Sequence, residues 1–364
     1  MAQKLHETKE KQKRALLVSL GDDDTGELQG LVSTLELEIA GLEAVKVRER
    51  NPKFGMGSGK AGEVAGKAKE MEVDCLVFDW DASPSQQRNW EELAGIPVID
   101  RQELIINIFA MRAVTREADL QVRLAELHYL LPRLTHKYID LSRQRGGRYG
   151  TRGAGETKLE TDRREIQKRI HKLEKEIDGV AKQRQVQRRQ RERQGLPVCA
   201  IVGYTNAGKS SLFNALSGSA VLVENKLFAT LDATTRRFEP TPGMGALLTD
   251  TVGFIRRLPH NLIKAFRSTL EEAAHASLLI HVLDAADPNI ESCFGTTVSV
   301  LQELGAGEIP VITVLNKTDL LGDEAQKDAL LLRFPQSLGI SAKTGKSLDE
   351  LKLRIAGKLN GSVM

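Results

Sequence analysis

One eight-residue stretch has the residue types and spacing of a loop that wraps around phosphate groups. It fits G-x-x-x-x-G-K-[ST], follows an apolar run at 198–202 that predicts a strand, and precedes a helical segment at 211–216. Glycines let backbone N–H groups turn toward a phosphate, and the helix N-terminus adds the positive end of its dipole. A Gly-rich turn without a ligand is the alternative, but the flanks favour a nucleoside triphosphate. The predicted contacts are Gly203, Tyr204, Thr205, Asn206, Ala207, Gly208, Lys209, Ser210 and Ser211.

A second segment, D-x-x-G, offers groups for a metal ion and for the terminal phosphate. It follows the apolar stretch 246–248, so Asp250 stands where a strand ends and can hold Mg²⁺ through water. The N–H of Gly253 would meet the γ-phosphate, Lys209 would reach the β- and γ-phosphates, and the Ser210 hydroxyl would bind Mg²⁺. Alone this pattern is weak, because Asp and Gly are common at strand ends. The predicted contacts are Asp250, Thr251, Val252 and Gly253.

Two later segments have the chemistry to select guanine. N-K-T-D follows an apolar run at 311–315, and the Asp319 carboxylate can accept both N1–H and N2–H₂ of guanine in a charge-assisted arrangement. The Lys317 stem could cover the face of the base, and the N–H of Ala342 could meet guanine O6. The predicted contacts are Asn316, Lys317, Asp319, Ser341, Ala342 and Lys343. In this order, each at a strand end, the segments are typical of a Ras-like GTP-binding domain over residues 196–360.

The sensor of the γ-phosphate is expected between the phosphate loop and D-x-x-G. A threonine there would close on Mg²⁺ and the γ-phosphate, and Thr230 and Thr234 are both candidates. Thr230 is preferred because F-A-T-L-D resembles the switch segment of translation-factor-related GTPases, whereas an ordinary polar loop is the alternative. Predicted nucleotide contacts are Phe228, Ala229, Thr230, Leu231 and Asp232, and predicted Mg²⁺ ligands are Ser210, Thr230 and Asp250.

The residue after D-x-x-G is Phe254, where Ras has the glutamine that orients the attacking water. Phenylalanine cannot orient water, so the isolated domain is expected to hydrolyse GTP slowly until another component completes the site. The residues assigned to catalysis are Lys209, Gly253 and Thr230. Asn206 resembles the asparagine of potassium-activated GTPases, which adds K⁺ as a candidate cofactor beside Mg²⁺.

Composition places these motifs in a larger protein of the reducing cytosol. A chain of 364 residues suggests two or three domains, and 41% hydrophobic residues is ordinary for a globular protein. The three cysteines are far apart, which indicates neither a disulfide framework nor a zinc site. No apolar run approaches the length of a membrane span, and the N-terminus lacks a signal-peptide core. We expect a cytoplasmic monomer.

The N-terminal part alternates between strand-like and helical patterns. Apolar runs at 15–20, 44–47, 75–78 and 97–99 predict a small α/β domain with a parallel sheet. The Gly-rich loop at 55–60 resembles a second phosphate loop but fails the pattern, with Phe54 in place of the first glycine and Ala61 in place of Ser or Thr. It is interpreted as a mobile loop before a helix, and an anion or RNA contact is the less favoured alternative.

Residues 115–194 carry two helical stripes of coiled-coil type. Apolar residues recur at alternating spacings of four and three, from Leu120 to Leu141 and again from Ile166 to Val180. A short loop joins them, which predicts an antiparallel helical hairpin whose stripes serve packing. Pro132 is expected to kink the first helix.

The loop between the stripes is basic and flexible. Residues 142–194 hold 17 Lys and Arg against 8 Asp and Glu, a net of +9 in a chain whose total is only +3. Arginine planes and a tyrosine ring suit RNA bases and phosphates, although a solvated charged helix with a floppy tip is the alternative. The predicted RNA contacts are Arg143, Arg145, Arg148, Tyr149 and Arg152.

Long motifs make the chain resemble one family over nearly its whole length: HflX, ribosome-associated GTPases of the Obg–HflX superfamily. The matching segments are S-P-S-Q-Q-R-N at 83–89, the Gly-rich signature at 145–157, and the GTPase segments at 203–210 and 250–255. The resemblance implies GTP and GDP binding, contact with the large ribosomal subunit and its rRNA, and splitting of stalled or idle ribosomes. A non-catalytic, GTP-switched assembly factor is the alternative, and ATP-dependent work by the N-terminal domain has no motif to support it.

The expected architecture is an N-terminal parallel α/β domain at 1–114, a basic helical hairpin with a Gly/Arg-rich tip at 115–195, and a Ras-like P-loop GTPase domain at 196–364. The chain stops soon after the GTPase fold, whereas many bacterial members of the family carry a further small domain there. Functions tied to that extension are left open.

Overall fold

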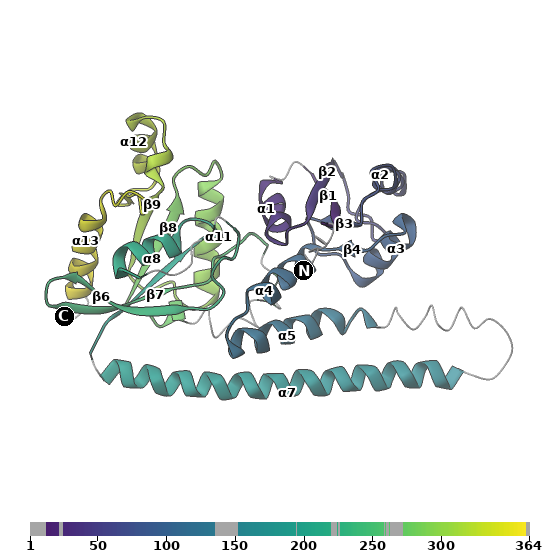
Figure 1. Cartoon of the computed structure of the whole chain (residues 1–364), viewed down its shortest axis with the longest axis horizontal. Helices are drawn as coiled ribbons and strands as arrows, with labels where there is room; N and C mark the ends of the chain where they lie inside the picture. The colour runs from purple at the N-terminus through teal and green to yellow at the C-terminus, as the bar shows by residue number, and fades with distance from the viewer. Residues whose placement is uncertain are drawn as a thin grey trace, which may run out of the picture. The chain divides into compact units, whose positions relative to one another are not determined.

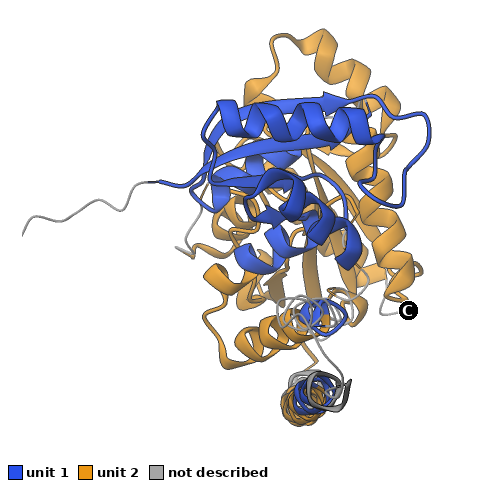
Figure 2. Ribbon diagram, turned by 90° about the vertical axis from the view of Figure 1, so that its right-hand side faces the viewer, with its two compact units in different colours: residues 1–108, 129–166 blue, residues 109–128, 167–364 orange. Residues whose placement is uncertain are grey.

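The computed structural model describes residues 12–21, 25–134, 152–193, 195–219, 224, 226–257, 259, 262 and 272–361. The chain divides into two compact units, residues 1–108 with 129–166 and residues 109–128 with 167–364 (Figure 2). Each unit contains its own sheet, fully or largely parallel, and its own hydrophobic core. Within the described ranges, every helix is too short or too polar to pass through a lipid bilayer.

The sheet of the first unit has the order β2-β1-β3-β4, and every pairing in it is parallel. Its helices α1 to α3 connect successive strands, and α4 follows the last strand (Figure 1). The predicted parallel α/β architecture is confirmed. The bounds are β1 Arg14–Leu20, α1 Gly26–Thr34, β2 Glu38–Val45, α2 Ser58–Glu70, β3 Cys75–Phe78, α3 Pro84–Ala94, β4 Val98–Ile99 and α4 Arg101–Arg112.

The second strand was predicted at the wrong place. It was expected at 44–47, whereas β2 begins at Glu38 and ends at Val45. Only Val45 of this strand is buried, because β2 lies at the edge of the sheet and most of its side chains are partly exposed. An apolar run identifies strands covered on both faces, so it missed most of an edge strand.

The S-P-S-Q-Q-R-N segment starts α3. The Ser83 hydroxyl accepts a hydrogen bond from the Gln86 N–H, the Gln86 side chain accepts one from the Ser83 N–H, and Pro84 occupies the first helical position. Further along the helix, Trp90 is fully buried, packs edge-on against Phe78, and donates its indole N–H to the Phe54 carbonyl at 2.9 Å. The motif therefore caps and starts the helix that carries Trp90 into the core of the first unit.

The sheet of the second unit has the order β10-β9-β8-β5-β7-β6 and is parallel except for the β6–β7 pair. Its core lies between the sheet and the helices α8 and α13. The predicted Ras-like α/β domain is confirmed. The bounds are β5 Val198–Gly203, α8 Lys209–Ser217, β6 Thr234–Thr241, β7 Met244–Asp250, β8 Leu278–Asp284, α11 Ile290–Glu303, β9 Val311–Asn316, the 3₁₀ turn η1 Thr318–Leu320, α12 Glu324–Arg333, β10 Leu338–Gly339 and α13 Leu348–Gly361.

The two expected helices of the hairpin are α5 (Arg116–Leu130) and α7 (Arg152–Arg193). Ion pairs join the first turn of α5 to the later half of α7, with Glu117 2.8 Å from Arg184 and Arg116 3.6 Å from Glu176. This is the pairing expected at the open end of an antiparallel hairpin.

Two details of the hairpin differ from the prediction. Pro132 does not kink the first helix, because α5 ends at Leu130. The second helix begins at Arg152, so the last part of the predicted glycine-rich loop is helical. The RNA contacts predicted at Arg143, Arg145, Arg148 and Tyr149 lie outside the described residues.

Candidate GTP-binding site

The phosphate loop leaves β5 and enters α8 through two positions that require glycine. Gly203 has φ 148°, and a Cβ there would lie 2.3 Å from the Val282 carbonyl oxygen. Gly208 has φ 90° and precedes the first residue of α8, and a Cβ there would lie 2.3 Å from Asn316 Nδ2. Any side chain would collide with these neighbours, so the two glycines let the loop close against β8 and β9.

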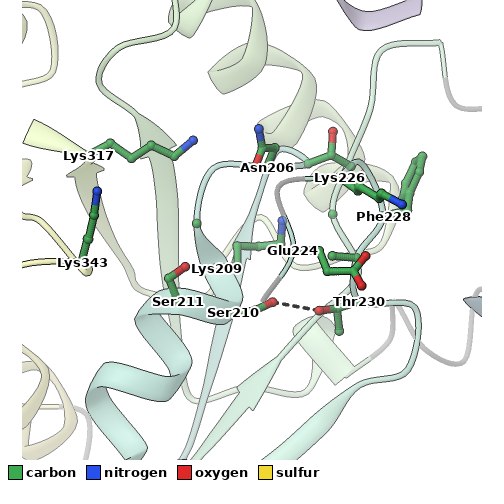
Figure 3. Close-up of a pocket in the computed structure, with 14 residues that line it drawn as sticks. Asn206, Lys209, Ser210, Ser211, Glu224, Lys226, Phe228, Thr230, Lys317 and Lys343 are labelled. Atoms are coloured by element: carbon green, nitrogen blue, oxygen red, sulfur yellow. Dashed lines mark hydrogen bonds between the residues drawn. The ribbon is translucent and has the colours of Figure 1, made fainter. Parts of the chain in front are cut away.

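A pocket of about 360 Å³ opens over this loop, which is within the usual size of a small-molecule site. Figure 3 shows Lys209, Ser210 and Thr230 on one side of it, and Lys317 and Lys343 on the other. The lining residues are Thr205, Asn206, Gly208, Lys209, Ser210, Ser211, Glu224, Lys226, Phe228, Ala229, Thr230, Gly253, Lys317 and Lys343.

Lys209 is held inside the site. Its ammonium donates a hydrogen bond to the Tyr204 carbonyl at 2.7 Å, and the residue is only 6% exposed. Burial lowers the pKa of Lys209 to about 8, with Asp250 opposing this effect and Lys317 adding to it. A buried cation with few neutralising partners favours an anionic ligand, such as a phosphate chain.

Three oxygen groups converge beside Lys209. Thr230 Oγ1 lies 2.8 Å from Ser210 Oγ (Figure 3). The Ser210 hydroxyl donates to Asp250 Oδ2 at 2.7 Å, and Thr230 Oγ1 lies 3.3 Å from the same carboxylate oxygen. Burial raises the pKa of Asp250, while the Ser210 hydrogen bond opposes the rise. Among the described residues, the buried Asp250 Oδ1 has no hydrogen-bond partner. Hydroxyl and carboxylate oxygens with such an orphaned acceptor fit a hard cation such as Mg²⁺.

The alternative γ-phosphate sensor, Thr234, occupies a different environment. It is the first residue of β6 and pairs with Asp250 across the antiparallel ladder. Its backbone is therefore part of the sheet, whereas Thr230 lies in the segment before the strand, with its hydroxyl at the Ser210–Asp250 pair. The geometry brings Thr230, and not Thr234, to the candidate metal ligands.

The other side of the pocket is organised by Asn316. Its side-chain amide donates to the Ala207 carbonyl and accepts from the Ala342 N–H, both at 3.0 Å, so it ties the phosphate loop to the S-A-K segment. The Ser341 hydroxyl donates to Asp319 Oδ1 at 2.6 Å, which orients the carboxylate assigned to guanine. These contacts position the candidate base-recognition groups relative to the phosphate loop.

The structure also shows residues that the motif reasoning missed. Glu224 and Lys226 line the pocket, and Asp284 at the end of β8 forms an ion pair with Lys317, whose ammonium donates to Asp284 Oδ2 at 2.7 Å. The apolar run at 278–283 was a signal for β8 and hence for Asp284, whereas Glu224 and Lys226 belong to no motif used here. Asp232, a predicted nucleotide contact, turns its carboxylate to Thr115.

Phe254 is buried, with 1% of its surface exposed, and its backbone extends the sheet beside the phosphate loop. Its N–H donates to the Gly203 carbonyl at 3.1 Å, and its carbonyl accepts from the Thr205 N–H at 2.8 Å. The position that follows D-x-x-G thus contributes to loop geometry and offers no polar side chain to a water molecule.

Comparison with known proteins identifies the family. The chain is 48% identical to "GTPase HflX" of Akkermansia muciniphila, over 95% of this chain and 84% of that protein, and 43% identical to "GTPase HflX" of Escherichia coli, over 94% and 80%. The chain belongs to the HflX family of GTPases. Family models match residues 22–110 of the chain as "GTP-binding GTPase N-terminal", 112–191 as "GTP-binding GTPase Middle Region" and 198–317 as "50S ribosome-binding GTPase".

A solved structure supports the HflX fold. The protein described as "SsGBP and GDP complex" is 26% identical, covers 95% of this chain and 98% of its own, and superposes with a TM-score of 0.53. As an HflX GTPase, the chain hydrolyses GTP through the P-loop domain of the second unit. The P-loop, the Thr230–Ser210–Asp250 cluster and the Asn316 bridge are its candidate nucleotide-binding elements.

Proposed function

We propose that this GTPase binds the large ribosomal subunit and uses GTP hydrolysis to split stalled or idle ribosomes into subunits. The observation that carries the proposal is the buried Phe254 beside an otherwise assembled phosphate and metal site. The pocket has groups for binding GTP, yet the position expected to orient water has an apolar side chain inside the core. A partner must complete the site, and the "50S ribosome-binding" description of the matching family model favours the large subunit.

Within this proposal, each group of the pocket has one task. Lys209 binds the β- and γ-phosphates, Ser210, Thr230 and Asp250 hold Mg²⁺, and the Gly253 N–H meets the γ-phosphate. When bound, Mg²⁺ neutralises charge on the phosphate oxygens. The Asp319 carboxylate, oriented by Ser341, selects guanine. GTP favours the ribosome-bound state, and hydrolysis permits release into a largely cytoplasmic pool.

The basic hairpin is the proposed contact with rRNA. The net charge of +9 over residues 142–194 sets this region apart, because the rest of the chain is net negative. Attraction to phosphates would bring the tip residues Arg143, Arg145, Arg148, Tyr149 and Arg152 to rRNA. The proposed division into domains at 1–114, 115–195 and 196–364 is supported by the bounds of the three family models.

The test is GTP hydrolysis measured alone, with large subunits, and with small subunits as a control. Large subunits should raise the rate strongly and small subunits should not. A variant lacking residues 145–151 removes Arg145, Arg148 and Tyr149 from the tip and leaves α7 intact from its first residue. It should keep GTP affinity and lose the stimulation, and light scattering should show that it no longer splits ribosomes.

Two results would contradict the proposal. Full stimulation of the tip-deleted variant would remove the hairpin from ribosome recognition. Binding to large subunits without any increase in hydrolysis would favour the other function that we consider, a GTP-switched assembly factor whose nucleotide only controls docking.

A further inference from the structure

The segment that carries Thr230 is bound at several points by the junction between α4 and α5. Phe228 packs edge-on against Phe109, with ring centroids 4.7 Å apart, and Glu224 forms an ion pair with Arg112 at 2.6 Å. Phe109 and Phe228 are each only 2% exposed. These residues all belong to the second compact unit, although Phe109 and Arg112 lie outside the P-loop motifs in sequence. Residues 224 and 226–232 are called the switch segment below.

Asp232 makes the most directional of these contacts. Its carboxylate accepts hydrogen bonds from the N–H groups of Val114 at 3.4 Å and Thr115 at 3.2 Å, and from the Thr115 hydroxyl. The Thr115 hydroxyl oxygen also accepts from the Ala118 N–H at 3.2 Å, so Thr115 caps the N-terminus of α5. A carboxylate at a helix N-terminus is favoured by the helix dipole, and hydrogen bonds to a charged acceptor are strong.

The other end of the same short stretch faces the nucleotide pocket. Thr230 lies two residues before Asp232, with its hydroxyl at Ser210 and Asp250. Leu231 between them is 3% exposed, so it anchors the chain in the core. Phe228 has φ 55°, a backbone conformation that bulky residues rarely adopt without support from their surroundings. The switch segment is therefore held from α5 on one side and from the candidate metal site on the other.

We propose that Thr115 is a positioning residue for the GTP-bound state: by binding Asp232, the N-terminus of α5 holds Thr230 in place for Mg²⁺ and the γ-phosphate. The coupling is reciprocal, because a γ-phosphate that holds Thr230 must also favour the Asp232–Thr115 contact. Glu117 of α5 pairs with Arg184 of α7, so a change at the N-terminus of α5 would also be felt by the second helix of the hairpin. The proposal rests on the GTP site and not on the ribosomal partner, and it is tested without ribosomes.

The first experiment compares affinities for a non-hydrolysable GTP analogue and for GDP in the presence of Mg²⁺. Thr115→Val removes the hydroxyl at nearly constant volume, Asp232→Asn removes the charge without altering the helix cap, and Thr115→Ser keeps the hydroxyl. We expect Thr115→Val and Asp232→Asn to weaken the analogue by about tenfold and to leave GDP nearly unchanged, since GDP offers no γ-phosphate to Thr230. Thr115→Ser should behave as the original protein.

The matched control is Thr296→Val, because the Thr296 hydroxyl makes an internal helix bond to the Ser292 carbonyl on the exposed side of α11. It should leave both affinities unchanged. The double variant Thr115→Val/Asp232→Asn should be no worse than either single variant, because both remove the same interaction. Equal loss of analogue and GDP affinity would indicate a merely structural contact, and an unchanged ratio in both single variants would overturn the proposal.

A second experiment measures the reverse effect, that of the bound nucleotide on the N-terminus of α5. All three native cysteines are buried, and Val114 is 89% exposed, so Val114→Cys offers a selective site for an environment-sensitive dye. The fluorescence of the labelled protein should differ between the GTP analogue and GDP, and Thr115→Val should abolish that difference. Identical spectra in both nucleotide states, with binding verified independently, would contradict the reciprocal coupling even if ribosomes still stimulate hydrolysis.

Discussion

Two glycine-rich loops precede helices in this protein, one in each compact unit, and both contain a lysine. In the second unit, residues 203–210 follow β5 directly, and Lys209 lies 6% exposed at the base of a pocket. In the first unit, the glycine-rich segment 55–60 runs into α2, which begins at Ser58, and the ammonium of Lys60 in the first turn of this helix is at the surface, paired with Glu63 at 2.7 Å. Similar sequences thus place similar side chains in opposite environments.

The difference comes from the way each loop is held. Asn316 and the neighbouring strand β8 leave no room for a side chain at Gly208 or Gly203, so the loop wraps closely over the strand ends. In the first unit, Met56 is fully buried, so the loop uses one of its own side chains to fill the core. A lysine can bind phosphate where the backbone closes around a pocket. A surface lysine that pairs with a carboxylate contributes little free energy through that exposed ion pair.

The strongest test of this comparison replaces each lysine with alanine. Lys209→Ala should weaken GTP binding by at least about a hundredfold, because it removes a buried, charge-assisted contact with the phosphates. Lys60→Ala should leave GTP affinity unchanged. Equilibrium titration with a fluorescent guanine nucleotide measures both, and a comparable loss in the two variants would show that the loop of the first unit also binds nucleotide.

Base selection should be the next largest effect. Asp319→Asn should weaken GTP by about a hundredfold, because the amide cannot accept both guanine donors, and should favour xanthosine triphosphate, whose C2 carbonyl needs a donor. Ser341→Ala removes only the hydroxyl that orients the carboxylate, at 2.6 Å, and should cost about tenfold. Competition between GTP and xanthosine triphosphate distinguishes a change in base preference from a general loss of affinity. Unchanged GTP affinity in Asp319→Asn would disprove the assignment of Asp319 to guanine.

The comparison also shows what sequence patterns can and cannot give. The strands β5 and β9 and the phosphate loop were predictable, because buried parallel strands are apolar runs and the loop glycines have no alternative. The strand β6 was not predicted, because the sequence T-T-R-R-F-E-P-T contains no apolar run and lies at the edge of the sheet, where polar side chains are exposed.

Contacts between segments that lie far apart in the chain could not be predicted from the sequence for a different reason. Thr115 and Asp232 are far apart in the chain, and Asp232 was assigned to the nucleotide from its neighbours in F-A-T-L-D. Only the fold brings the α5 N-terminus to it. The same applies to the ion pair between Asp284 and Lys317, because no local spacing in the sequence links the end of β8 to the residue after β9.

Proton affinity offers a more modest test of the buried lysine. Burial lowers the pKa of Lys209 to about 8, and phosphate binds the protonated form of its ammonium group. The protonated fraction falls as the pH rises through this value, so GTP affinity should drop about fourfold between pH 7 and pH 8.5. The free energy of unfolding should rise with pH above 8, because the unfolded chain, with the ordinary lysine pKa, then binds more protons. A flat affinity profile would contradict a buried, partly neutral Lys209.

The smallest expected effect concerns the monovalent cation. Asn206 lines the pocket with φ 61°, a left-handed conformation that asparagine adopts more readily than most residues, and loop 55–60 has no counterpart to it. If its side chain helps to hold K⁺ near the phosphates, GTP turnover should be several-fold higher in K⁺ than in Na⁺ at equal ionic strength. Asn206→Ala should remove this difference while GDP affinity stays nearly constant. Equal rates in the two salts would remove K⁺ from the mechanism and leave charge neutralisation to Lys209, Mg²⁺ and the ribosome.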